Sequence, residues 1–179
     1  MSTKFSDFQI IRDHIKTLKF YDTENIDKPS LLMNFGVPLI LAFIFLYFHS
    51  FLQSSIITVL ITVLSIFIAL LLNLLFLMYS ILSRRLRGDN ELKTQQSKNE
   101  SANENEMKVR LLKETYYNVQ FSVLICVYAL IAIILYVLLP KEIYLDLVLD
   151  FIVYYLLFVF ITTLLMILKR THTLFSREF

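Results

Sequence analysis

Four long stretches of this chain contain almost no charged residues. Three of them hold eighteen, thirty-four and twenty-one consecutive uncharged residues, at 31–48, 50–83 and 119–139. The fourth, 143–168, carries Asp146 and Asp150 near its start and ends in eighteen uncharged residues. Because a helix rises about 1.5 Å per residue and bilayer hydrocarbon is about 30 Å thick, each stretch is long enough to cross a membrane. The sequence therefore predicts an all-α, four-helix transmembrane protein.

The composition agrees with this prediction and excludes several other classes. Hydrophobic residues make up 57% of the 179 residues and charged residues 18%, whereas soluble domains average about 45–50% and about 25%. Two glycines and three prolines supply too few turns for an all-β sandwich or barrel. The single cysteine, Cys126, excludes a disulfide framework and a cysteine-based metal site. A formal charge of +2 is too balanced to indicate nucleic-acid binding by itself.

The sequence contains no pattern typical of an enzyme. The H-E-x-x-H, G-x-S-x-G, P-loop and acidic metal-binding motifs are absent. His14, His49 and His172 are far apart, and the predicted topology puts His49 across the membrane from the others, so they cannot hold haem together. We therefore predict no catalytic residues, no metal and no cofactor.

Lysine and arginine predict the orientation in the membrane. Sixteen of the seventeen basic residues lie before residue 31, between the second and third spans, or after residue 168, and only Lys141 lies elsewhere. Because basic residues are retained on the cytoplasmic side, both termini and the central connection are predicted to be cytoplasmic. The chain would then form two transmembrane hairpins with short outer loops.

Five segments follow from this topology. Residues 88–106 contain one leucine and one alanine and otherwise polar or turn residues, so they are predicted to form a flexible loop. The full division is an amphipathic helix and linker at 1–30, a hairpin at 31–87 with spans at 31–48 and 55–82, the polar loop at 88–106, a cytoplasmic extension and second hairpin at 107–168 with spans at 117–139 and 143–168, and a cytoplasmic tail at 169–179.

The N-terminal segment predicts an amphipathic helix over residues 5–21. Apolar side chains recur there at intervals of three and four, with charged residues on the other faces. Three placements fit this pattern: an anchor in the headgroup region, a plug below a pore, or a contact with the same helix of a neighbouring subunit. The candidates for the plug or subunit contact are Phe5, Phe8, Ile11 and Ile15.

The second uncharged stretch carries small and polar residues along one helix face. Its members are Thr58, Thr62, Ser65, Ala69, Asn73 and Ser80. Two interpretations remain open: a seam where helices approach closely, and the lining of a pore in which Asn73 forms a polar collar. Thr58, Thr62, Ser65 and Asn73 are the pore-lining candidates.

Two carboxylates, Asp146 and Asp150, stand four residues apart on one face of the last span. Around a symmetry axis they would form stacked acidic rings that concentrate cations, so both are candidates for the pore or its gate. Alternatively, Asp146 complements a helix N-terminus and Asp150 lies at the headgroup level.

Basic residues gather where the second and third spans leave the membrane. They are Arg84, Arg85, Arg87, Lys108, Arg110 and Lys113. This cluster fits an anchor on anionic lipid or an electropositive vestibule for a phosphate-bearing ligand.

The first span begins with Asn34, Gly36 and Pro38 within five residues. Proline removes a backbone donor and glycine permits close approach, so a kinked or tightly packed helix start is predicted, with a gating hinge as the alternative.

The layout as a whole resembles the small four-span membrane effectors of bacterial anti-phage defence systems. The resemblance rests on the amphipathic N-terminal helix, the strings LLLNLLFLMYSIL and LLKETYYNVQFSVLI on either side of a polar loop, and the ending LLMILKRTHTLFSREF. The Hailong-type effector is the nearest in layout, and the Kiwa-type membrane component is a more distant alternative.

This resemblance implies an inner-membrane channel that is held closed until infection and then depolarises the cell, as in abortive infection. For the Hailong type the trigger is a nucleic-acid oligomer, so a partner nucleotidyltransferase or its product is an expected partner. A single four-helix chain has no room for an aqueous path, so we expect a homo-oligomer, with a tetramer favoured. The alternative function is a non-conducting membrane scaffold that recruits a cytosolic partner.

Overall fold

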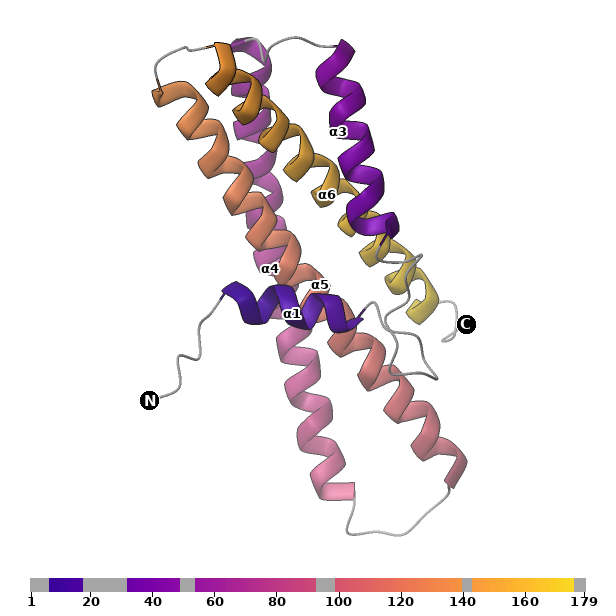
Figure 1. Ribbon diagram of the computed structural model, residues 1–179. Helices are drawn as coiled ribbons and strands as arrows, with labels where there is room; N and C mark the ends of the chain where they lie inside the picture. Colours follow the sequence, from indigo (N-terminus) through magenta and orange to yellow (C-terminus); the bar gives the residue numbers. More distant parts are fainter. Residues whose placement is uncertain (1–6, 18–31, 49–53, 93–98, 140–142, 176–179) are drawn as a thin grey trace.

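The computed structural model describes residues 7–17, 32–48, 54–92, 99–139 and 143–175, and this part of the chain is all-α (Figure 1). Its elements in chain order are α1 (Asp7–Thr17), the π-helical turn η1 (Leu32–Gly36), α3 (Val37–Phe48), α4 (Ser54–Leu92), α5 (Asn99–Leu138) and α6 (Ile143–Phe175).

Three of these helices are long and apolar enough to cross a membrane. They contain the apolar segments Ser55–Arg84 in α4, Val109–Leu138 in α5 and Tyr144–His172 in α6. A shorter apolar helix, Leu32–Phe48, combines η1 and α3. Within the described residues, the prediction of an all-α chain with several apolar helices is confirmed, and the three long helices indicate a multi-pass membrane protein.

Helix α5 lies at the centre of the bundle. Helix α6 packs along it, α4 packs on another side of α5, and α3 packs against α6 (Figure 1). Of the most apolar window of each long helix, 44% is buried in α5, 33% in α6 and only 17% in α4. Among the three long helices, α4 therefore has the apolar window that the described part of the chain covers least.

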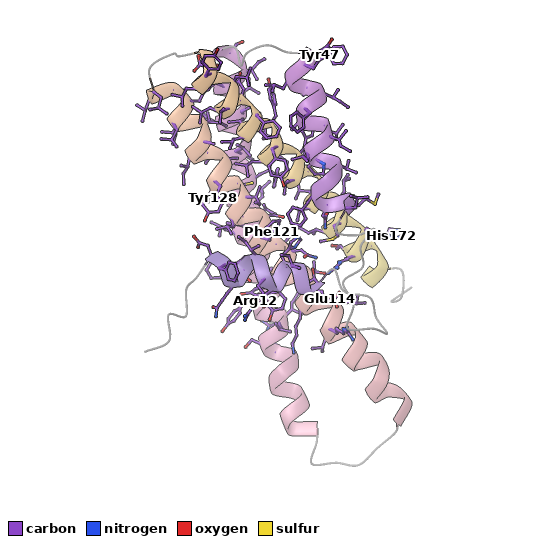
Figure 2. The ribbon with its side chains drawn as sticks, in the orientation of Figure 1. Arg12, Tyr47, Glu114, Phe121, Tyr128 and His172 are labelled. Atoms are coloured by element: carbon purple, nitrogen blue, oxygen red, sulfur yellow. The ribbon has the colours of Figure 1, made fainter. Side chains whose placement is uncertain are left out.

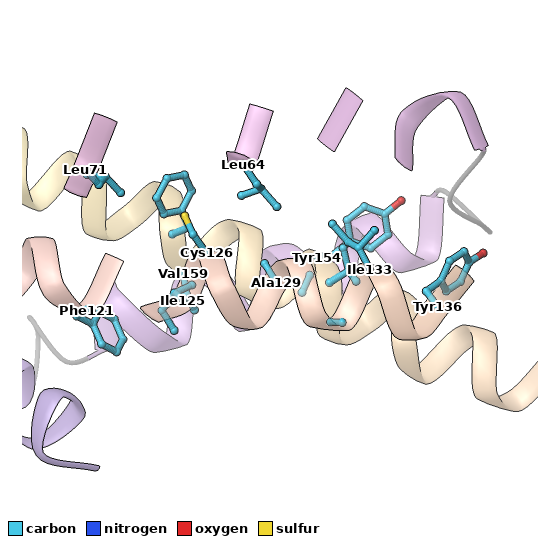
Figure 3. Packing of buried hydrophobic residues seen from close by; sticks show 14 of the residues in the cluster. Leu64, Leu71, Phe121, Ile125, Cys126, Ala129, Ile133, Tyr136, Tyr154 and Val159 are labelled. Atoms are coloured by element: carbon cyan, nitrogen blue, oxygen red, sulfur yellow. The ribbon is translucent and has the colours of Figure 1, made fainter. Parts of the chain in front are cut away.

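The α4–α5 contact uses a seven-residue repeat on α4. The buried residues of α4 are Ile57, Leu64, Leu71 and Met78. A spacing of seven keeps side chains on one seam of a helix that packs lengthwise against a partner. Figure 3 shows Leu64 and Leu71 pointing toward the part of α5 that carries Cys126 and Ala129. The small Ala129 lets the two helices approach closely.

The first apolar helix begins with a π-helical turn where Asn34, Gly36 and Pro38 predicted a kink or tight packing, and Asn34 and Pro38 are both buried there. Residues Leu32–Gly36 form a π-helical turn before α3 continues as an α-helix. Pro38 has no N–H to give to the carbonyl four residues earlier, so the regular pattern cannot extend backward through it. The side chain of Asn34 is turned inward and donates from Nδ2 to Met166 Sδ of α6 at 3.3 Å.

The described parts of the polar stretch, 88–92 and 99–106, are helical, although the sequence predicted a flexible loop over 88–106; residues 93–98 of that prediction lie outside the described residues. Helix α4 continues to Leu92 and α5 already begins at Asn99. Extending an existing helix adds one hydrogen bond per residue fixed, whereas only nucleation is costly. The long apolar helices therefore carry polar residues with them beyond the bundle, on the side where α1 lies (Figure 1).

Candidate functional site

The polar stripe of α4 faces away from the rest of the chain. Thr58, Thr62, Ser65 and Asn73 are all exposed. Thr62 donates to the carbonyl oxygen of Thr58 at 2.9 Å, and Ser65 donates to that of Ile61 at 2.7 Å. These hydroxyls are thus bonded to their own helix. The stripe is not a seam between helices of one chain, because the buried seam of α4 lies on another face.

The two aspartates of α6 lie elsewhere. Asp146 stands in the first turn of α6, and both Asp146 and Asp150 are buried inside the chain. The position of Asp146 agrees with the alternative interpretation, in which a carboxylate complements a helix N-terminus. The structure does not bring these carboxylates together with the α4 stripe, since one set faces inward and the other outward.

The basic cluster is partly neutralised by Glu114. Arg84 is exposed on α4, and Arg110 and Lys113 are exposed on α5. Arg110 Nε lies 3.3 Å from Glu114 Oε1, and Arg170 Nη1 of α6 lies 3.2 Å from Glu114 Oε2. The other three candidates have side chains outside the described residues; they are Arg85, Arg87 and Lys108.

Helix α1 lies across α5 of its own chain (Figure 1). The predicted amphipathic helix is confirmed for the described part, Asp7–Thr17. Of the four candidates for a plug or subunit contact, Phe5 is outside the described residues, Phe8 is 70% exposed, Ile15 is half-buried and Ile11 packs against the hydrophobic core. The most buried residue of α1 is instead His14.

His14 occupies an aromatic cradle. Its ring stacks on that of Phe121 in α5, with centroids 3.9 Å apart and planes 5° apart. The ring of Phe35 in η1 meets it edge-on at 6.3 Å. Nδ1 of His14 lies 2.9 Å from Oδ1 of the buried Asn118. Because an amide oxygen only accepts, this geometry puts the imidazole proton on Nδ1.

Arg170 and Thr17 complete the contact at the end of α1. The Thr17 hydroxyl lies 2.7 Å from the carbonyl oxygen of His14 and 2.9 Å from Asn118 Oδ1. Arg170 Nη2 donates to the carbonyl oxygen of Thr17 at 2.7 Å. A cation at a helix C-terminus satisfies its last carbonyls and complements the helix dipole. We call His14, Thr17, Glu114, Asn118 and Arg170 the docking cluster; it joins α1, α5 and α6. Figure 2 shows Glu114 near the C-terminal end of α1 and Phe121 beside the helix.

The other end of α1 has its own attachment. The hydroxyl of Tyr128 donates to Asp7 Oδ2 at 2.8 Å. Asp7 and Thr17 stand at the two ends of α1, so these hydrogen bonds fix α1 on α5 at both of its ends.

Burial controls the charge of His14. It lowers the pKa of His14 from 6.5 to about 4; the hydrogen bond with Asn118 raises this pKa and the charge of Arg170 lowers it. His14 is therefore neutral at pH 7 while α1 is docked.

The docking cluster is not among the sites that the sequence predicts. The histidines enter those predictions only as haem ligands, and Arg170 only as one of the basic residues that indicate orientation. One signal was present: Ile10, His14 and Thr17 follow the i, i+4, i+7 spacing of a single helix face. That spacing places His14 on the buried side of α1, although it does not identify the partner.

Comparison of the chain with known protein families, curated proteins and solved structures finds no match among them.

Proposed function

We propose that the chain is a four-span bacterial inner-membrane protein with both termini in the cytoplasm, and that it assembles into a homo-oligomeric channel lined by α4, with a tetramer favoured. The fourth span is Leu32–Phe48, which at about 1.5 Å per residue covers about 25 Å, the lower end of a spanning length. The end of α3, the start of α4, the end of α5 and the start of α6 lie together at one end of the bundle, which supports two hairpins (Figure 1).

The main support for this proposal is the exposed polar stripe of α4. A carboxamide in hydrocarbon has no water to bond, so Asn73 on an outward face requires either a second copy of the chain or a water-filled path beside it. Closed symmetry brings the same face of each copy toward one axis. Several α4 helices around an axis supply both a second copy of the chain and a water-filled path for Asn73, with hydroxyl oxygens and amides facing the path and Leu and Phe between them.

The effector role comes from the resemblance to anti-phage membrane proteins. A channel that depolarises its own cell has to stay closed until a signal arrives. The exposed Arg84, Arg110 and Lys113 lie where α4 and α5 leave the apolar bundle, and such residues attract anions. A cytosolic nucleotide or oligonucleotide is therefore the proposed trigger, with its nucleotidyltransferase as partner.

Reconstitution tests the channel. Purified protein in liposomes is assayed for ion flux, alone and with a panel of nucleotides and short oligonucleotides, and its subunits are counted in detergent-free discs. We expect flux from the wild type and altered flux from Asn73→Leu, which removes the amide at nearly constant volume. Leu70→Val is the matched control, because Leu70 is exposed on α4 outside the polar stripe.

Two results would overturn the proposal. One is a monomer in the discs. The other is an oligomer that conducts under none of the conditions, which would assign the non-conducting scaffold instead. Identical flux from the wild type and Asn73→Leu would remove α4 as the lining.

A further inference from the structure

The docking cluster places a titratable group at the contact of a short helix with three other elements. His14 belongs to α1, while the residues around it come from η1, α5 and α6. Helix α1 has eleven residues, and isolated helices shorter than about 12–15 residues are marginal in water. The helix therefore depends on this contact for its order.

We propose that protonation of His14 releases α1 from the bundle, so that α1 is a pH-sensitive clamp on α5 and α6. Release of α1 is a property of one chain and is measured without any flux. Only its consequence, a change in conductance, rests on the proposed function.

A protonated His14 has no suitable partner in the docked position. Protonation adds a donor at Nε2, and this atom is buried without a hydrogen-bond partner among the described residues. The ring of Phe121 attracts a cation over its face. That attraction is weaker than the cost of burying a charge without a paired anion.

The charged groups around the site do not supply that anion. From α6, Arg170 adds a like charge. From α5, the carboxylate of Glu114 lies between Arg110 and Arg170. On α1 itself Asp13 is the neighbour of His14 in sequence, but the charged group that acts on the pKa of His14 is Arg170, which lowers it. The η1 residues Leu32–Gly36 carry no charge.

The direction and size of the effect follow from linkage. The released helix binds a proton with the ordinary pKa of 6.5, and the docked helix with a pKa of about 4. Docking is therefore fully favoured above pH 6.5 and weakens as the pH falls toward 4. The equilibrium constant for docking drops about tenfold by pH 5.5 and about thirtyfold by pH 5.

Hydrogen exchange on the full-length chain in lipid discs tests the clamp. The protection factors of the α1 amides, corrected for intrinsic exchange, are compared between pH 7.5 and pH 5. We expect about a thirtyfold loss of α1 protection at pH 5 in the wild type, and about a tenfold loss in a further measurement at pH 5.5, while the central α5 amides keep their protection.

Two variants remove the titration without removing the side-chain volume. His14→Phe keeps a ring on Phe121, and His14→Gln keeps a donor for Asn118; in both, α1 protection should no longer depend on pH. Protection of α5 reports whether each variant is folded. A wild-type α1 that is equally protected at all these pH values would overturn the proposal, and so would an unchanged pH dependence in either folded variant.

A separate flux assay at pH 7.5 and 5.5 then asks whether release alters conductance. If α1 is released and flux is absent throughout, the clamp stands and the channel function fails. If flux is present and α1 stays docked, the clamp fails and the channel stands.

Discussion

Replacing Phe121 by alanine should undock α1 while leaving the bundle intact. Phe121 is 2% exposed and contacts both His14 and Phe35. Truncating a buried phenylalanine costs about 3–5 kcal/mol, and losing an aromatic pair accounts for about 0.5–1.5 kcal/mol beyond the buried area. For the loss of α1 docking free energy we use the lower end of this range, about 3 kcal/mol, because the released helix can still rest its apolar face on the membrane surface.

A difference of about 3 kcal/mol corresponds to a change of roughly a hundredfold in the docking equilibrium. Trypsin cleavage at Arg12, measured in discs, reports this equilibrium, because a protease needs a segment that has left its packed position. We expect the rate of cleavage at Arg12 to rise about a hundredfold in Phe121→Ala. Phe121→Leu keeps most of the apolar volume and loses the ring stack, so its rate should rise only about two- to tenfold.

Leu138→Ala is the matched control, since Leu138 is 75% exposed on the same helix. Its cleavage rate should equal that of the wild type. Equal rates in Phe121→Ala and the wild type would refute the assignment of Phe121 as the floor of the α1 site. Loss of hydrogen-exchange protection at the central α5 amides in Phe121→Ala would mean instead that the ring holds the whole bundle together.

Three further substitutions test other contacts. Arg170→Met removes the donor to Thr17 and one of the two guanidinium partners of Glu114. Docking of α1 should therefore weaken by about 1–3 kcal/mol, and cleavage at Arg12 should accelerate. An unchanged cleavage rate would show that α1 docks without the hydrogen bond from Arg170 to Thr17. Cys126 is buried, so a maleimide should label Arg84→Cys in discs and leave Cys126 unlabelled until detergent denaturation; rapid labelling of the native cysteine would contradict the packing of α5. At Gly36 a Cβ would meet Leu32 Cδ1 at 2.9 Å, but Leu32 is 68% exposed and can rotate away. Gly36→Ala should therefore change the free energy of unfolding in detergent by less than about 1 kcal/mol. A large drop in the unfolding temperature would mean that the π-helical turn needs glycine.

The apolar helices could be predicted from the sequence, because the property that defines them is local. A run such as 119–139 excludes charge along its whole length, and its helical form follows from the need to satisfy backbone groups inside the run. The unusual start of the first apolar helix was likewise predictable, because Gly36 and Pro38 lie within the segment that they affect. Such features can be predicted without knowing which helices pack against them.

The orientation of each helix was harder to predict. Helix α4 is apolar on nearly every side, so the stripe with Thr58 and Asn73 is visible in the sequence, but its direction is not. The seven-residue seam from Ile57 to Met78 decides that direction, and it consists of the same residue types as the lipid-facing surface. Only the partner helix, α5, distinguishes the two faces.

The docking cluster could not be predicted, since its members are far apart in the sequence. His14 and Asn118 are separated by 104 positions, and Arg170 and Thr17 by 153. Each residue alone has an ordinary explanation: a histidine in an amphipathic helix, an asparagine before an apolar run, an arginine after one. Their joint role exists only once α1 crosses α5 beside the end of α6.

The position of the cluster along α5 explains why a titratable group can serve there. Asn118 immediately precedes the uncharged run 119–139, so the cluster lies where the charged part of α5 gives way to its uncharged run. Two turns farther into the run, a protonated histidine would be surrounded by hydrocarbon whether or not α1 moved, so release of α1 would not lower the free energy of the charged ring. Several residues farther out along α5, water would reach the ring in the docked state, and the pKa of His14 would stay near 6.5. The boundary is the one depth at which docking buries the ring and release hydrates it, and this difference is what links the charge of His14 to the position of α1.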